Sequence, residues 1–180
     1  MVNNKFRSQM EIINSSIEDI DKIFLLYDDA IEYQKKVFYK HWGGFERKLI
    51  ECEIMENRLW KIVIENEIAC VFSICFNDSL FWKEKDNQPS IYIHRIAINS
   101  KFRGSGFMYP IIEWSRQYCK TNGKEFIRMD TWGDNPKLIG YYVRCGFNHI
   151  ETVVLDKIEG LPIHYIKNET LALLEIKAHG

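Results

Sequence analysis

The spacing of apolar residues along this chain changes repeatedly between the period of a helix and the period of a strand. From Ser16 onward apolar residues recur every three or four positions, and Ser16 with Asp19 forms a capping-box-like start, so a helix is predicted here. A second helix is predicted at about Phe45–Met55. Two extended apolar runs, Leu59–Ile64 and Ile68–Phe76, flank a short polar turn and predict a β-hairpin.

The second half of the chain continues this alternation. An apolar run ending at Ile98 leads through a glycine turn into an amphipathic stretch that stops at Asn122-Gly123, a common helix end. Asn135-Pro136 supplies the cap and the first residue of a last helix. The other expected boundaries are a strand at Met10–Ile13, the end of the first helix at about Phe38, a polar surface loop at Lys83–Ser90, a strand at Phe126–Thr131, a helix end at Gly146, and strands at Phe147–Leu155 and Ile163–Leu174.

Length and composition narrow the class of protein. With 180 residues and 46% hydrophobic content, the chain can bury one sizeable core, so residues 1–180 are expected to form a single domain. The formal net charge of −1 gives no general case for a nucleic-acid or membrane partner. No apolar run reaches the roughly 20 residues of a membrane span or resembles a signal peptide, so a cytoplasmic location is expected. The sequence leaves the oligomeric state open, with a homodimer as one option.

Cysteine and histidine positions argue against a disulfide framework and against a metal site. The five cysteines lie in apolar runs without a CxxC pair, which is typical of buried, reduced thiols. The five histidines show neither HxxxH nor HExxH spacing. We therefore predict no metal site.

The sequence KFRGSG, from Lys101 to Gly106, carries the strongest chemical signal in the chain. It joins the apolar run IYIHRIAIN to the amphipathic run FMYPIIEWSRQYCK, and a strand that turns directly into a helix leaves backbone N–H groups unpaired at the positive end of the helix dipole. Such a turn suits phosphate. Gly104 and Gly106 allow close backbone approach, and Lys101 and Arg103 add positive charge. From these residues alone, an ordinary basic turn is an equally good interpretation.

A second motif makes the interpretation more specific. The segment NPKLIGYYVRCGF places Asn135, Tyr142, Gly146 and Phe147 in one helix and its end. With this motif, the turn and the order of elements, nearly the whole chain resembles the GNAT superfamily of acyl-CoA-dependent N-acetyltransferases, although Lys101 stands where the family's turn motif has Gln or Arg. The resemblance implies an α/β (α+β) three-layer fold, with a central mixed, mostly antiparallel sheet of six or seven strands flanked by about four helices.

The same resemblance implies acetyl-CoA as the co-substrate. Backbone amides from Phe102 to Phe107 would hold the pyrophosphate, and Pro110 would not disturb them because it follows them. Pantetheine would lie in a gap where the strand ending near Ile98 splays from the next strand, with an amide near Ile96–Ile98 facing the thioester carbonyl. Asn135 would bond the pantetheine arm, act as a plain helix cap, or do both. The implied cofactor-binding residues are Ile96, Ala97, Ile98, Lys101, Phe102, Arg103, Gly104, Ser105, Gly106, Phe107, Asn135 and Tyr142.

Direct attack of an amine on a thioester needs an oxyanion donor, a proton acceptor and a proton donor for the leaving sulfur. Tyr142 occupies the family position of that donor, whereas helical spacing alone would assign it to a buried helix face. The central strand has no acid, so His94 is the first candidate for the base and Tyr92 the second. For His94 a structural role is the competing interpretation.

The acceptor side is defined less well. In the family, the first two helices and the loop before the central strand shape the acceptor pocket. Aromatic side chains there could bind a cationic amine by cation–π contact or belong to the core. We expect a small-molecule primary amine as acceptor; the alternatives are a peptide N-terminus or lysine, and a non-catalytic acyl-CoA-binding module. The candidate acceptor residues are Tyr33, Phe38, Tyr39, His41, Trp42, Phe45, Phe81 and Trp82.

Overall fold

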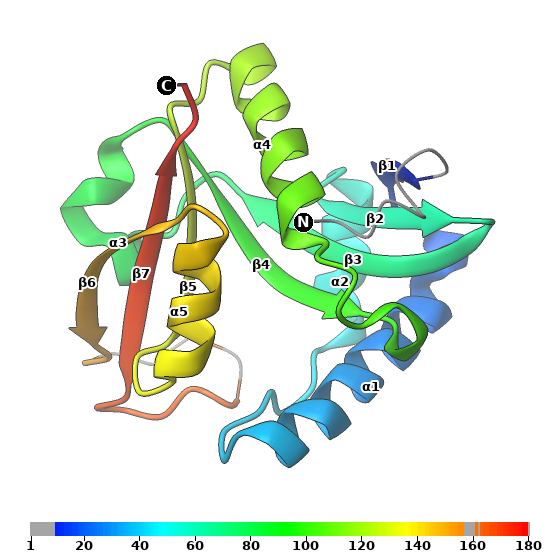
Figure 1. The fold of residues 1–180 in the computed structure, drawn as a ribbon, viewed down its shortest axis with the longest axis horizontal. Coiled ribbons are helices and arrows are strands. Elements are labelled where there is room, and N and C mark those ends of the chain that lie inside the picture. Colours follow the sequence, from blue (N-terminus) through cyan, green and yellow to red (C-terminus); the bar gives the residue numbers. More distant parts are fainter. Residues whose placement is uncertain (1–9, 157–160, 162, 180) are drawn as a thin grey trace. The chain divides into compact units, whose positions relative to one another are not determined.

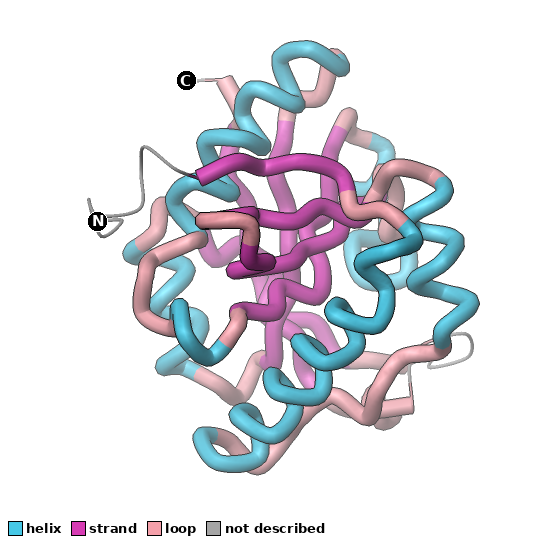
Figure 2. The backbone as a smooth tube through the Cα atoms, turned by 90° about the vertical axis from the view of Figure 1, so that its right-hand side faces the viewer, coloured by secondary structure: helices cyan, strands magenta, loops and turns pink. Residues whose placement is uncertain are grey.

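The computed structural model describes residues 10–156, 161 and 163–179 of the chain. Its seven strands form one mixed sheet in the order β1-β2-β3-β4-β5-β7-β6, which confirms the predicted fold class. Figure 2 shows the strands in magenta and the helices in cyan. The strands are β1 (Met10–Asn14), β2 (Leu59–Ile64), β3 (Glu67–Cys75), β4 (Ser90–Ile98), β5 (Phe126–Trp132), β6 (Asn148–Val154) and β7 (Thr170–Lys177), and the helices are α1 (Ile20–Val37), α2 (Arg47–Met55), α3 (Ser79–Trp82), α4 (Met108–Asn122) and α5 (Pro136–Arg144).

The described residues divide into two compact units. The first contains residues 10–74, 95–110 and 163–164, and the second contains residues 75–94, 111–156, 161 and 165–179. The division falls within β4, so His94 belongs to the second unit and Arg95 to the first. No helix among the described residues is both long and apolar enough to cross a bilayer.

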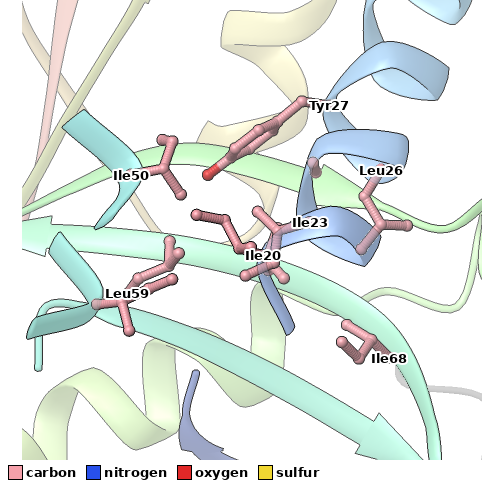
Figure 3. Close-up of a cluster of buried hydrophobic side chains, with 10 residues drawn as sticks. Ile20, Ile23, Leu26, Tyr27, Ile50, Leu59 and Ile68 are labelled. Atoms are coloured by element: carbon pink, nitrogen blue, oxygen red, sulfur yellow. The ribbon is translucent and has the colours of Figure 1, made fainter. Parts of the chain in front are cut away.

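The first unit is organised around β1, β2 and β3, which pair antiparallel. The β2–β3 connection is tight because Glu65 and Asn66 both take positive φ, 51° and 64°, as a two-residue hairpin turn requires. Apolar residues of α1 and α2 pack with strand residues in a cluster in which Ile23, Ile50 and Leu59 have no exposed surface (Figure 3). Burying each of these side chains contributes roughly 1.5–3 kcal/mol relative to its exposed state.

The second unit contains the carboxyl-terminal strands. β4 and β5 run parallel, and β7 pairs antiparallel with both β5 and β6 and lies between them (Figure 1). Arg128 of β5 has no exposed side-chain surface, but its charge is compensated because it donates to Glu175 at 2.8 Å and its guanidinium lies over the Trp82 ring. This buried arginine is a structural residue of the core.

The predicted elements occur in the predicted order with one short helix added, and three local predictions need correction. The last strand begins at Thr170 rather than Ile163, because the polar run before it forms a turn with Asn168 at φ 69°. The loop predicted at Lys83–Ser90 contains a 3-10 helix, Lys83–Asn87, and its Ser90 already belongs to β4. Helix α3 was not predicted, since its four residues are too few for a periodic pattern. The cysteines are free, but Cys52 and Cys75 are half-buried rather than buried.

Candidate functional site

In the first unit, the turn between β4 and α4 has the conformation that the two glycines predict. Gly104 and Gly106 take φ of 81° and 75°, a region that residues with a Cβ rarely adopt. Asn99 caps the preceding 3-10 turn by accepting from the Lys101 N–H at 3.1 Å. The backbone amides of Gly104, Gly106 and Phe107 donate no hydrogen bond to any described residue. These three N–H groups are therefore available to an anion.

The two predicted cations of this turn already have acidic partners. Lys101 Nζ lies 2.7 Å from Glu67 Oε1, and Arg103 Nη2 lies 2.7 Å from Asp29 Oδ2. Arg103 also lies over the Tyr33 ring, 4.3 Å from its centroid. Exposed ion pairs of this kind are worth about 0–1 kcal/mol, so a bound diphosphate could compete for both cations.

Strand β4 carries an unusual backbone conformation directly before the three predicted thioester-facing residues Ile96, Ala97 and Ile98. Arg95 takes φ 49°, although it is neither glycine nor in a turn. Its guanidinium is held by Glu53 of α2 and by Ser73 Oγ, the latter at 2.8 Å. Glu53 is only 3% exposed and also accepts from Arg58 at 3.4 Å. An ion pair with a buried carboxylate and a partly exposed guanidinium therefore holds the one residue that breaks the extended conformation of β4.

The pairing of β4 with β5 is described for the first residues of each strand, and the splay beyond them stays a prediction. In the described register the parallel pairs run from Ser90 with Phe126 to Tyr92 with Arg128. Both strands continue beyond these pairs, and β5 keeps its antiparallel pairing with β7 through Trp132.

In the second unit, Asn135 lies directly before α5 and Tyr142 lies within this helix. The Asn135 side chain accepts from the Leu138 N–H at 3.1 Å, which confirms its role as a helix cap with Pro136 as the first residue. Tyr142 is half-buried and its ring contacts Tyr141 and Phe147. No residue of α5 is fully buried, so the idea that Tyr142 only fills a buried helix face loses support.

His94 lies beside an aspartate on each side and a cysteine, which no sequence motif predicted. Its Nδ1 is 3.8 Å from Asp130 Oδ1, and its Nε2 is 3.7 Å from Asp78 Oδ2 and 3.2 Å from Cys75 Sγ. Burial and the negative charges of Asp130 and Asp86 raise the pKa of Asp78 to about 8. Asp78 is therefore mostly protonated at neutral pH, which leaves Asp130 as the carboxyl group beside His94 Nδ1.

Asp78, His94 and Asp130 are the described residues whose arrangement comes nearest to a metal site, with one potential ligand atom of each lying within 4.8 Å of the others. The two carboxylates lie beside opposite nitrogens of one imidazole ring. A single ion binds only one of these nitrogens, so the arrangement suits a histidine that exchanges protons better than a metal centre. Sequence spacing missed the group because its members come from three distant segments.

Tyr92, the second candidate for the base, is a core residue. It has no exposed surface, it donates to Asp86 at 2.6 Å, and it accepts from Arg128 at 3.1 Å. Burial, followed by the hydrogen bond to Asp86, raises the pKa of Tyr92 to about 12. These contacts remove Tyr92 from the candidate bases.

The predicted acceptor aromatics separate into three groups. Phe81 and Trp82 are core residues of the second unit, 4% and 2% exposed. In the first unit, Trp42 and Phe45 are half-buried and pack against Tyr27. The remaining candidates lie at or near the surface of the same unit: Tyr33, Phe38, Tyr39 and His41.

His164 also belongs to this aromatic group. It was not predicted from the sequence, because it lies in a loop without a motif. Its ring packs edge-on against Phe45, 6.0 Å between centroids. Burial, with the charges of Arg95 and His41, lowers the pKa of His164 to about 4. His164 is therefore neutral at physiological pH and adds an uncharged ring to the aromatic surface.

A mixed sheet with a glycine turn between β4 and α4, and a capped helix with a half-buried tyrosine, defines a class of acyl-CoA-dependent transferases. Comparison with known proteins places the chain within this class. Residues 24–147 match the model of the Acetyltransferase (GNAT) family, and the chain belongs to this family. Members of the family use acetyl-CoA as the acyl donor.

One curated protein and several solved structures are similar to this chain. The chain is 30% identical over 70 residues to the uncharacterized N-acetyltransferase YesJ of Bacillus subtilis, a match that covers 39% of each chain. A GNAT acetyltransferase from Listeria monocytogenes has the same fold, with a TM-score of 0.74, 21% identity, and 93% and 94% of the two chains covered. A chimera of the spermidine N-acetyltransferase SpeG from Vibrio cholerae and hSSAT gives a TM-score of 0.63 at 15% identity, over 94% and 96% of the chains.

Proposed function

We propose that residues 1–180 form one acetyltransferase domain that transfers the acetyl group of acetyl-CoA to a primary amine of a small molecule by direct attack. The observation that carries this proposal is the turn with three available amides at Gly104, Gly106 and Phe107. Such a turn suits a diphosphate, and coenzyme A carries one. The matches to solved acetyltransferases, which cover 93% or more of the chain, support treating it as one domain.

In the proposed complex the turn residues 101–107 hold the pyrophosphate, largely through backbone amides. An amide among Ile96, Ala97 and Ile98 faces the thioester carbonyl, and the preceding Arg95 conformation supports this role because it breaks regular strand geometry at this point. The Asn135 amide nitrogen bonds the pantetheine arm while its oxygen continues to cap α5.

The proposed chemistry uses His94 as the proton acceptor and Tyr142 as the proton donor. His94 takes the proton that the amine loses during attack, and Asp130 at Nδ1 stabilises the resulting imidazolium. Tyr142 donates to the leaving thiolate, which a phenol can do because it is protonated at neutral pH. No step requires a metal.

A cationic small amine is favoured as the acceptor by the aromatic groups of the first unit. Trp42 and the neutral His164 flank Phe45, and the Arg95 guanidinium already lies over the Phe45 ring, 5.6 Å from its centroid, so this aromatic group accommodates a cation. The spermidine acetyltransferase with a related fold acts on such an amine. A peptide N-terminus or lysine is the second candidate for the acceptor, and a non-catalytic acyl-CoA-binding module is the third possibility.

Acetyl-CoA binding tests the carrying observation through two matched variants. Gly104→Val and Gly123→Val both place a branched side chain at positive φ, 81° and 63°, with no atom within 4 Å of the new Cβ. Both should lose comparable stability from backbone strain. Only Gly104→Val should lose the rise in melting temperature that acetyl-CoA gives the parent protein. An equal rise in both folded variants would show that the turn does not hold the phosphates.

A further inference from the structure

Three side chains on neighbouring strands form a row. The proposed direct attack uses two of them, His94 and Asp130, and gives Cys75 no role. Cys75 is the last residue of β3, His94 lies in β4 and Asp130 lies in β5, and the sheet places these strands side by side. Cys75 Sγ lies 3.2 Å from His94 Nε2, and His94 Nδ1 lies 3.8 Å from Asp130 Oδ1. A thiol, an imidazole and a carboxylate in this order are the parts of an activated nucleophile.

The tautomer that Asp130 favours suits this role. With its proton on Nδ1, facing Asp130, neutral His94 leaves Nε2 as an acceptor directed at the thiol. Cys75 Sγ also lies 3.2 Å from the Asn77 carbonyl, so the S–H group can donate to either acceptor. Activation therefore requires only a rotation of the S–H bond.

Exposure separates Cys75 and Cys52 from the other three thiols. Cys70, Cys119 and Cys145 are buried, and burial raises the pKa of the Cys70 and Cys119 thiols. Cys75 and Cys52 are both half-buried. Among the described residues, Cys52 has no hydrogen-bonded histidine, so it is a matched reference thiol within the same chain.

We propose that Cys75 is a nucleophilic thiol that accepts an acyl group from acyl thioesters. His94 Nε2 takes the thiol proton, and the Cys75 sulfur attacks the carbonyl carbon of the thioester. The bond from that carbon to the donor sulfur breaks, and the departing thiolate takes the proton from His94. The products are acetyl-Cys75 and the free donor thiol, with no oxidant or reductant involved. The proposed function enters only as the reason to name acetyl-CoA as a donor.

The test measures acylation and alkylation of individual cysteines by peptide mass spectrometry. The full chain is incubated without amine, once with acetyl-CoA and once with S-acetyl-N-acetylcysteamine, a short thioester that needs no phosphate site. Iodoacetamide serves as a third, donor-independent reagent. We expect Cys75 to react at least about tenfold faster than Cys52 with all three. His94→Gln should slow Cys75 by about 10²-fold or more and leave the rate of Cys52 unchanged.

The denaturation midpoint of His94→Gln shows whether this variant is folded. If it does not fold, Asp130→Asn tests the same prediction by removing the carboxylate beside His94. Cys75 rates equal to those of Cys52, or unchanged in both variants, would overturn the proposal. Labelling of Cys75 by the short thioester and iodoacetamide, without any binding of acetyl-CoA, would support the reactive thiol and contradict the proposed function. Amine acetylation by a protein whose Cys75 stays unlabelled would support the proposed function and contradict the reactive thiol.

Discussion

The conformation of Arg95 predicts an unusual response to substitution by glycine. In an ordinary strand, glycine is about 0.5–1 kcal/mol less stable than alanine. At φ 49°, an L-residue instead carries a conformational cost of about 1–2 kcal/mol that glycine avoids. We therefore expect Arg95→Gly to be more stable than Arg95→Ala, by about 1 kcal/mol, which reverses the order expected for a regular strand.

Both variants also lose the buried ion pair. Glu53 is 3% exposed, and removal of one partner of a buried pair costs about 3–5 kcal/mol because the other charge stays buried. Arg58 remains 3.4 Å from Glu53, so we expect the low end, about 3 kcal/mol, for Arg95→Ala and about 2 kcal/mol for Arg95→Gly. Glu53→Gln in the alanine background should recover part of this loss, since it removes the uncompensated charge.

Urea denaturation of the four proteins, followed by circular dichroism, measures these differences. We expect unchanged m-values and urea midpoints that decrease from the parent to Arg95→Gly and then to Arg95→Ala. An alanine variant that is more stable than the glycine variant would refute the left-handed conformation at position 95. Equal stability of all four proteins would refute the energetic role of the ion pair.

Three further predictions concern single positions. Tyr142→Phe should lower the single-turnover rate by about 10²–10⁴-fold with little change in acetyl-CoA affinity. Tyr141→Phe, which alters the neighbouring half-buried ring, should change neither quantity. An unchanged rate in Tyr142→Phe would show that Tyr142 is not the proton donor. Gly104→Val should abolish stabilisation by acetyl-CoA in thermal unfolding, with Gly123→Val as the strained control. Folded Asp78 keeps its proton to about pH 8, whereas unfolded Asp78 loses it near pH 3.8, so the contribution of Asp78 to the free energy of unfolding falls by about 1.4 kcal/mol per pH unit between these values. The difference in unfolding free energy between the parent and Asp78→Asn should follow this slope. A difference that does not change with pH would contradict the raised pKa.

The sequence predicted most elements of the fold because their signals are local. Asn135-Pro136, Asn122-Gly123 and the alternation in Leu59–Ile64 each act within a few residues, and the corresponding boundaries agree with the structure to within one or two positions. The start of β7 was predicted wrongly because apolar residues from Ile163 onward suggest a strand, whereas the polar residues directly before Thr170 form a turn at Asn168.

The surroundings of His94 could not be predicted from local signals. Cys75, Asp78 and Asp130 come to His94 from β3, the segment before α3, and β5, so their proximity depends on strand order and register. The ion pair between Glu53 and Arg95 likewise joins α2 to β4 across 42 positions. In contrast, the conformation of the turn at Gly104 and Gly106 was predictable, because glycine permits the positive φ that both positions take.

The most direct test of the account is release of free coenzyme A thiol from acetyl-CoA across a panel of amines. The panel should contain polyamines, amino acids, amino sugars, and peptides with a free N-terminus or lysine, with a thiol-reactive dye as the readout and the no-amine rate subtracted. We predict amine-dependent turnover that is fastest with a small cationic amine and is lost in Gly104→Val. Acetyl-CoA binding without turnover on any amine would contradict the proposed acetyl transfer and favour a binding module. Turnover on peptides alone would contradict a small-molecule acceptor and favour a protein acceptor.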